Sequence, residues 1–179
     1  MFSTNNTALI IIDVQGKLAS VMHESEALLK NIEILIQGAK LLNIPIIWME
    51  QYPKGLGPTA TQVEQHLTEE EPIAKKIFSA CQSERFQKEI VELERHQLLV
   101  VGIEAHICVY QTVRELLESK KEVEVVVDAV SSRTCQNKEI AIEKMKALGA
   151  GITSVEMILF ELMQTADHPK FKEISKLIK

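Results

Sequence analysis

This sequence of 179 residues has no long apolar run and no excess of positive charge, and its aromatic side chains are few. No stretch reaches the roughly 18 apolar residues that a membrane-spanning helix requires, so we expect no association with a membrane. Aromatic residues make up only 4% of the chain, and its net charge is −5. These values argue against stacking platforms for single-stranded nucleic acid and against a broad basic surface for nucleic acid of any kind.

Cysteine is also scarce, with three residues in no regular spacing, at Cys81, Cys108 and Cys135. An odd number without a framework pattern argues against a disulfide-stabilised secreted domain and favours a reducing compartment. The first residues, 1–6, lack the basic and apolar regions of a secretory signal. We therefore expect a cytoplasmic protein.

The sequence does contain short apolar segments that alternate with segments of helical periodicity. Segments of strand length lie at residues 7–12, 44–49, 98–101, 123–127 and 150–153, with a shorter, irregular candidate at 73–80. Apolar residues recur at helical spacing over 24–42, 83–93, 107–119, 137–148, 157–163 and from 169 onward, and a short helix is predicted at 61–67.

This alternation predicts the fold class. Strands that are apolar on both faces are typical of a parallel sheet covered by helices on both sides. Right-handed crossovers then give a three-layer α/β/α sandwich with a Rossmann-like, mostly parallel sheet. The sequence shows no repeat, low-complexity tract or linker, so we expect residues 1–179 to form one domain.

Turn and cap residues mark several of the expected boundaries. Asn137 is the predicted N-cap of the helix 137–148, and Gly149 suits the position after its C-terminus. The segment 153–156 has the spacing of a capping box ahead of the helix 157–163. Asp128 closes the strand 123–127 and is interpreted as a turn or cap residue.

Chemically useful side chains follow the predicted strands at the carboxyl edge of the sheet, where ligands bind in folds of this kind. Asp13 comes directly after the first strand, and Lys75 lies in the irregular segment 73–80. Cys108 follows the strand 98–101 and a glycine, at the point where the next helix is expected to begin. The sequence therefore predicts that Asp13, Lys75 and Cys108 meet at one edge of the sheet.

These three residue types form a set suited to nucleophilic catalysis. Cys108 would attack an electrophilic carbon, and Asp13 would take the thiol proton and return it to the leaving group. The charge of Lys75 and the helix N-terminus would lower the pKa of the thiol, about 8.5 when free, toward neutrality. Backbone N–H groups of Glu104 and Cys108 would hold the oxyanion. A lone cysteine that opens a helix is more often structural, so this interpretation depends on Asp13 and Lys75.

Two other function classes stay open on these residues. A nucleotide-binding domain of the flavodoxin type would have a similar fold, but no Gly-x-Gly-x-x-Gly or Walker loop follows the first strand. Asp13 at that position would also repel a pyrophosphate. The other alternative is a catalytically silent, oligomeric interaction module that keeps the same fold.

Three short motifs together resemble the signatures of the isochorismatase-like cysteine hydrolases. They are 13–15 after the first strand, 75–80 and 102–109, and their order and spacing match over almost the whole chain. Other segments resemble the isochorismatase-domain-containing protein 2 subgroup, namely 50–57, 128–133 and 167–174.

The resemblance implies the same roles for the aspartate, lysine and cysteine of the predicted site. It also implies a cis peptide bond between Ile103 and Glu104, which would direct N–H groups at the oxyanion. The nicotinamidases of this superfamily bind a metal through Asp-x-His, where this chain has Glu-Gln-Tyr at 50–52. We therefore expect neither a metal ion nor another cofactor.

The sequence thus predicts a hydrolase that cleaves a C–N bond in a small carbonyl or amide-type substrate through a covalent cysteine intermediate. Gln15, Tyr52 and Phe78 are expected to line the substrate pocket. The Lys-x-x-Phe-Ser register favours Lys75 over Lys76 as the residue that faces the thiol, since strand neighbours point to opposite faces. Relatives are commonly oligomeric, which implies a homo-oligomer of two or more subunits.

Overall fold

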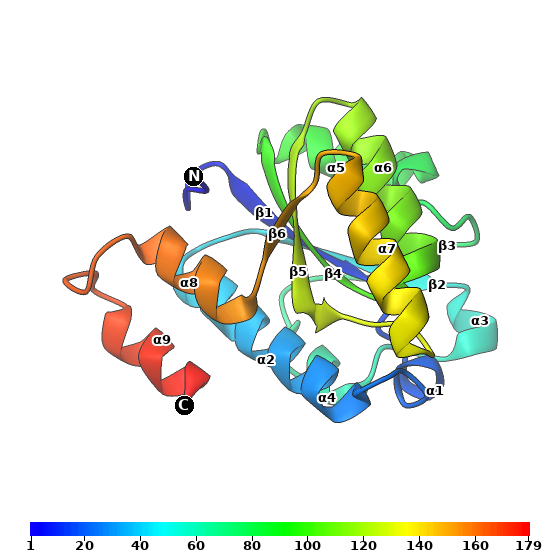
Figure 1. Ribbon diagram of the computed structural model, residues 1–179, viewed down its shortest axis with the longest axis horizontal. Helices are drawn as coiled ribbons and strands as arrows, with labels where there is room; N and C mark the ends of the chain where they lie inside the picture. The colour runs from blue at the N-terminus through cyan, green and yellow to red at the C-terminus, as the bar shows by residue number, and fades with distance from the viewer.

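A six-stranded parallel sheet, in the order β3-β2-β1-β4-β5-β6, lies at the centre of the computed structural model, which describes residues 1–179. The strands are β1 (Thr7–Ile12), β2 (Ile46–Gln51), β3 (Ile73–Lys75), β4 (Gln97–Gly102), β5 (Glu122–Val130) and β6 (Gly151–Thr153). The chain moves outward from β1 in one direction and then, from β4, in the other (Figure 1). The switch point between β1 and β4 is where ligands bind in sheets of this topology.

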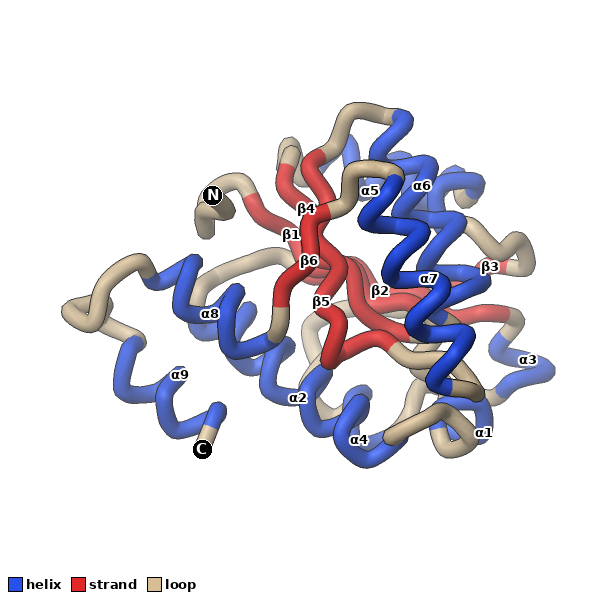
Figure 2. The backbone as a smooth tube through the Cα atoms, in the orientation of Figure 1, coloured by secondary structure: helices blue, strands red, loops and turns tan.

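Helices cover both faces of the sheet, which runs between them in Figure 2. The helices are α1 (Gly16–Ala19), α2 (Ser25–Leu41), α3 (Pro53–Leu56), α4 (Thr61–Glu64), α5 (Glu84–Glu92), α6 (Tyr110–Glu118), α7 (Cys135–Ala147), α8 (Val155–Met163) and α9 (Phe171–Ile178). α2, α8 and α9 bury apolar residues against one face, and α5, α6 and α7 against the other. None of these helices combines the length and the apolar character that crossing a bilayer requires.

β1 shows why the sequence folds in three layers. All of its residues are buried. Leu9 and Ile11 belong to the core beneath α2, whereas Ile10 and Ile12 belong to the core beneath α6. Burying one such side chain stabilises the fold by about 1.5–3 kcal/mol, so both faces of the strand require a covering layer. The predicted α/β/α sandwich with a Rossmann-like parallel sheet is confirmed.

Three strands differ from the prediction by more than one residue. β2 spans Ile46–Gln51 rather than 44–49. β5 continues past its expected end to Val130, because its register with β4 shifts and pairing resumes between Gly102 and Val130. Asp128 therefore lies inside β5, and its carboxylate accepts the N–H of Val155 at 3.0 Å, at the start of α8. β3 is shorter than the irregular segment 73–80, since it ends at Lys75.

Two helices begin earlier than the sequence predicts. Asn137 is not the N-cap of α7, because the Thr134 hydroxyl fills that role and accepts the Asn137 N–H at 3.2 Å. Ser154, not Thr153, caps α8 by accepting the N–H of Met157 at 3.3 Å. Both capping residues have the extended backbone that an N-cap requires, and Asn137 lies within the helix.

Candidate active site

The three predicted site residues meet at the carboxyl edge of the sheet, beside the switch point. Asp13 directly follows β1, Lys75 is the last residue of β3, and Cys108 lies in a π-helical turn, Ala105–Val109, after β4. All three are buried, with exposed fractions of 1%, 4% and 6%. Lys76, by contrast, is exposed, so the structure places Lys75 and not its neighbour in the site.

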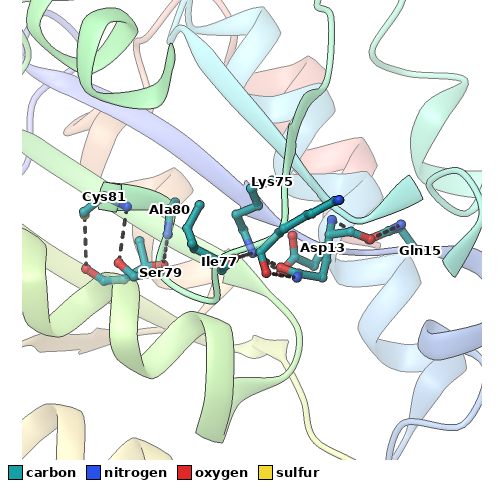
Figure 3. A network of polar contacts seen from close by, with 10 residues as sticks. Asp13, Gln15, Lys75, Ile77, Ser79, Ala80 and Cys81 are labelled. Atoms are coloured by element: carbon teal, nitrogen blue, oxygen red, sulfur yellow. Dashed lines mark hydrogen bonds and ion pairs between the residues drawn. The ribbon is translucent and has the colours of Figure 1, made fainter. Parts of the chain in front are cut away.

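Asp13 and Lys75 form a buried ion pair, and their side chains point toward each other in Figure 3. Lys75 Nζ donates to Asp13 Oδ2 at 2.7 Å. Burial raises the pKa of the Asp13 carboxyl above its ordinary value, and the charge of Lys75 opposes this shift only in part. The charge of Glu50 raises the same pKa further. Removing one partner of such a fully desolvated pair strongly destabilises the folded protein, because the other charge stays buried without compensation.

The other Asp13 oxygen, Oδ1, is buried and has no hydrogen-bond partner. The Cys108 thiol is close enough to this carboxylate to lower the pKa of Asp13. A buried acceptor without a partner is rare in native proteins and calls for an explanation. Oδ1 is therefore a carboxylate oxygen that no donor of the protein occupies.

The thiol itself does not have the lowered pKa that the sequence predicts. Burial raises the pKa of Cys108 to about 12, and the negative charge of Asp13 adds to this, while Lys75 acts in the opposite direction. Cys108 is the fourth residue of the π-helical turn, which continues directly into α6, so it lies in the first turn of this helix as the sequence predicts. This position in the first turn does not offset the cost of burial, and the thiol is protonated at rest.

The loop before Cys108 approaches β1 very closely. Gly102 has a φ of 116°, and a Cβ there would lie 2.0 Å from the Ile12 carbonyl oxygen, so only glycine fits. The next residue, Ile103, donates its N–H to that same oxygen at 2.9 Å. The peptide bond between Ile103 and Glu104 is cis, at the position to which the resemblance assigns it. The N–H of Glu104 has no partner within the protein.

Two other residues at strand ends have structural contacts. Glu50 is buried and accepts both the N–H and the hydroxyl of Thr59, each at 2.8 Å, which fixes the loop after β2. The side chain of Glu104 pairs with Arg133 at 2.9 Å. No group of three or more His, Cys, Asp or Glu side chains is placed to hold a metal ion.

The predicted pocket residues lie in different settings. Tyr52 and Phe78 are exposed, at 46% and 54%. Tyr52 lines a hollow of about 380 Å³ together with Lys75 and Lys76. Gln15 is wholly buried, and its amide bonds to the backbone of Gln51 and Gly57 instead of facing a cavity. Gln15 therefore shapes a pocket only indirectly, through residues 51–57, which its amide holds in place.

Sequence reasoning missed Gln51, which contacts the site directly. Its Oε1 accepts a hydrogen bond from Lys75 Nζ at 2.6 Å. The one available signal is its position at the carboxyl end of β2, between Glu50 and Tyr52. A lone glutamine in a strand carries no distinctive pattern, so only the fold shows this contact.

Comparison with known proteins identifies the family of this chain. The model of the isochorismatase domain matches residues 7–157. The chain belongs to the isochorismatase family. Isochorismatase domain-containing protein 2 of Danio rerio is 36% identical over 177 residues, which cover 98% of this chain and 88% of the relative. The secreted isochorismatase effector Isc1 of Phytophthora sojae is 35% identical over 184 residues, which cover 98% and 85%.

Solved structures of other proteins superimpose over the full fold. MAR1 ribonuclease from Caenorhabditis elegans matches with a TM-score of 0.93 and 40% identity, covering 99% of this chain and 91% of that one. The YcaC gene product of Escherichia coli, described as an octameric hydrolase of unknown specificity, matches with a TM-score of 0.93 over 99% and 88%. Its identity is 23%, so this likeness concerns the fold alone. The protein is thus an isochorismatase family hydrolase with an α/β sandwich.

Proposed function

We propose that this isochorismatase family hydrolase cleaves a C–N bond in a small carbonyl or amide-type substrate, with Asp13, Lys75 and Cys108 as its catalytic residues. The observation that carries the proposal is the buried carboxylate of Asp13, which lies near the Cys108 thiol and whose Oδ1 has no partner while Lys75 holds the other oxygen. A nucleophile, a base within its reach and a third group that orients the base are the recurring parts of a covalent hydrolase.

The first half-reaction begins with a protonated thiol. Asp13 Oδ1 takes the thiol proton as Cys108 Sγ attacks the substrate carbonyl carbon and forms the new S–C bond. The carbonyl π electrons move to oxygen, and the N–H of Glu104 donates to this oxyanion. The oxyanion then re-forms the carbonyl, the C–N bond breaks, and the leaving nitrogen takes the proton from Asp13.

The second half-reaction releases the acid. A water molecule gives a proton to Asp13 and attacks the thioester carbon. The tetrahedral intermediate collapses, the C–S bond breaks, and the sulfur regains the proton from Asp13. Throughout, the positive charge of Lys75 remains beside the carboxylate, and a fixed charge in a water-excluded site needs no reorganisation as the reaction proceeds.

A panel of small primary amides and carbamoyl compounds tests this proposal, with wild type compared to Cys108→Ala. We expect release of ammonia or amine from at least one compound and a loss of about a thousand-fold or more in the variant. Mass spectrometry of wild type with that compound should show an acyl group on Cys108. Activity that survives Cys108→Ala would overturn the assignment of the nucleophile.

The panel also separates the other function classes. One solved relative is described as a ribonuclease, so single-stranded RNA is included, and cleavage that depends on Cys108 would replace the small-molecule assignment. The absence of turnover and of any acylated Cys108 would favour the catalytically silent interaction module.

We further propose a homo-oligomer that works in the cytoplasm. The octameric structure of similar fold supports assembly, and the scarce cysteines of this chain support a reducing compartment. Light scattering of the purified protein tests the first point, and a monomeric mass would contradict it. Imaging of the tagged full chain in cells tests the second, because a homologue is a secreted effector and export would overturn it.

A further inference from the structure

The ammonium group of Lys75 has no hydrogen left for a substrate. An ammonium carries three N–H donors, and Lys75 Nζ contacts Asp13 Oδ2 at 2.7 Å, Gln51 Oε1 at 2.6 Å and the Ile77 carbonyl at 3.3 Å. All three acceptors belong to the protein. Lys75 is therefore held as a fixed positive charge, and its position depends on what holds it on the side away from Asp13.

Gln51 is the residue on that side. β2 and β3 pair in parallel, and their register makes Gln51 the direct neighbour of Lys75. The amide has a defined orientation, because Nε2 donates to the Lys76 carbonyl at 2.8 Å and leaves Oε1 toward the ammonium. Rotation of the amide would bring its NH₂ group against a cation, which has no acceptor to offer.

The backbone of Gln51 is held in turn by Gln15. Gln15 Oε1 accepts the Gln51 N–H at 2.8 Å, and Gln15 Nε2 donates to the Gln51 carbonyl at 2.9 Å. The same Nε2 donates to the Gly57 carbonyl at 2.6 Å, so one buried amide joins both ends of residues 51–57. Contacts thus run without a gap from Gln15 through Gln51 and Lys75 to Asp13.

We propose that Gln51 is a positioning residue for the catalytic pair: its Oε1 keeps the Lys75 ammonium on Asp13 Oδ2 and thereby leaves Oδ1 free for the proton of Cys108. Without this acceptor, one buried N–H of Lys75 has no partner. The ammonium then satisfies it on the second oxygen of the carboxylate that it already contacts, and the base loses its open position. This inference rests on the proposed function, but it concerns the state of the thiol and not the identity of the substrate.

The test compares Gln51→Met, which keeps the length of the side chain and loses the oxygen, with Gln51→Glu, which keeps an oxygen there. Gln82→Met is the matched control, because Gln82 is a glutamine whose exposed amide contacts only Glu115. Labelling of Cys108 by iodoacetamide is followed by peptide mass spectrometry from pH 6 to pH 9, and the thermal midpoint is recorded for each variant.

We expect Gln51→Met to label Cys108 about ten-fold more slowly near neutral pH, since a hydrogen bond to a charged group is lost. Gln51→Glu should recover most of the rate, and Gln82→Met should match wild type. Equal labelling of Gln51→Met and wild type would overturn the inference, as would a Gln51→Glu rate no higher than that of Gln51→Met. If Gln51→Met does not fold, Gln51→Asn, which withdraws the oxygen by one methylene, replaces it with the same expected direction.

Labelling needs no substrate, so its outcome is separate from that of the amide panel. If Gln51→Met is labelled as fast as wild type while the enzyme is active and depends on Cys108, only the positioning role of Gln51 is contradicted. Wild-type Cys108 that labels no faster than it does in Lys75→Met would instead contradict the proposed catalytic pair. With an active substrate, Gln51→Met should lower kcat and leave KM near the wild-type value, because Gln51 does not touch the substrate.

Discussion

Cys108 and Cys81 are two thiols of the same molecule with the same shift and different neighbours. Burial raises the pKa of each to about 12. The thiol of Cys81 donates to the Thr112 carbonyl at 3.7 Å and faces the charge of Glu115. Cys108 faces a buried carboxylate that is held by Lys75. Figure 3 shows Cys81 with Ser79 and Ala80 in one group and Asp13 with Lys75 in another.

The difference teaches that burial alone makes a thiol inert. A carbonyl oxygen cannot accept a proton from Cys81 at neutral pH, so that thiol has no route to the thiolate. In the proposed mechanism, Asp13 gives Cys108 such a route, and Lys75 compensates the charge that remains. Reactivity therefore depends on where the proton can go and not on the resting pKa of the sulfur.

Lys75→Met is expected to remove the difference in reactivity between Cys108 and Cys81, and its effect should be the largest of those predicted. It leaves the Asp13 carboxylate buried without its cation, so the free energy of unfolding should fall by about 3–5 kcal/mol. Labelling of Cys108 at neutral pH should fall to the rate of Cys81. Urea unfolding and site-resolved alkylation measure both effects. Lys76→Met is the matched control, since Lys76 is the exposed neighbour, and a similar loss in that variant would contradict the assignment.

Gln15→Leu tests whether the difference in reactivity between Cys108 and Cys81 depends on the loop after β2. The substitution removes a buried amide that makes three hydrogen bonds to the backbone, so we expect a loss of about 2–3 kcal/mol in the free energy of unfolding. Labelling of Cys108 should slow while that of Cys81 stays unchanged. Stability equal to wild type would show that the loop is held by other contacts.

The pH dependence of labelling should separate the two thiols by about ten-fold near neutrality. Labelling of Cys108 requires Asp13 in its charged form, so its rate should fall as the pH drops through the raised pKa of Asp13. Labelling of Cys81 should instead rise steadily with pH, because its thiolate forms only toward a pKa of about 12. Parallel profiles for the two residues, measured by peptide mass spectrometry, would argue that Asp13 does not act as the base.

The smallest expected effect is on stability at alkaline pH. Cys81 has an ordinary pKa of 9.0 and a folded pKa of about 12. A raised folded pKa contributes stability that is complete below pH 9 and is lost as the pH rises toward 12. Between pH 8 and 10, Cys81→Ala should therefore lose less stability than wild type in urea unfolding. An equal decline would mean that the thiol titrates normally in the folded protein.

The sequence predicted most of the fold and which three side chains meet at the carboxyl edge of the sheet. β1 and α2 follow directly from apolar spacing, and the positions of Asp13 and Cys108 follow from the strands before them. Lys75 could be separated from Lys76 by strand alternation and the motif register. These inferences succeeded because each depends on a local pattern or on the common edge of a parallel sheet.

Other features depend on contacts that no local pattern records. The roles of Gln15 and Gln51 arise because β1, β2 and β3 bring their amides together, and the pKa of Cys108 depends on the depth at which the turn is buried. The true cap of α7 is Thr134, since backbone geometry rather than residue type chose between two suitable side chains. Roles that depend on contacts between residues far apart in the sequence could therefore be assigned only from the structure.

The three-residue strand β3 pairs with a neighbour on one side only, and this gives the protein a specific weakness. A short edge strand detaches from a sheet with less work than the centre of the sheet requires. Because Lys75 is its last residue, fraying of β3 would uncouple the charge pair while the rest of the chain stays folded. Enzymatic activity should then be lost at a lower urea concentration than the helical circular dichroism signal, because the site depends on the strand that detaches first.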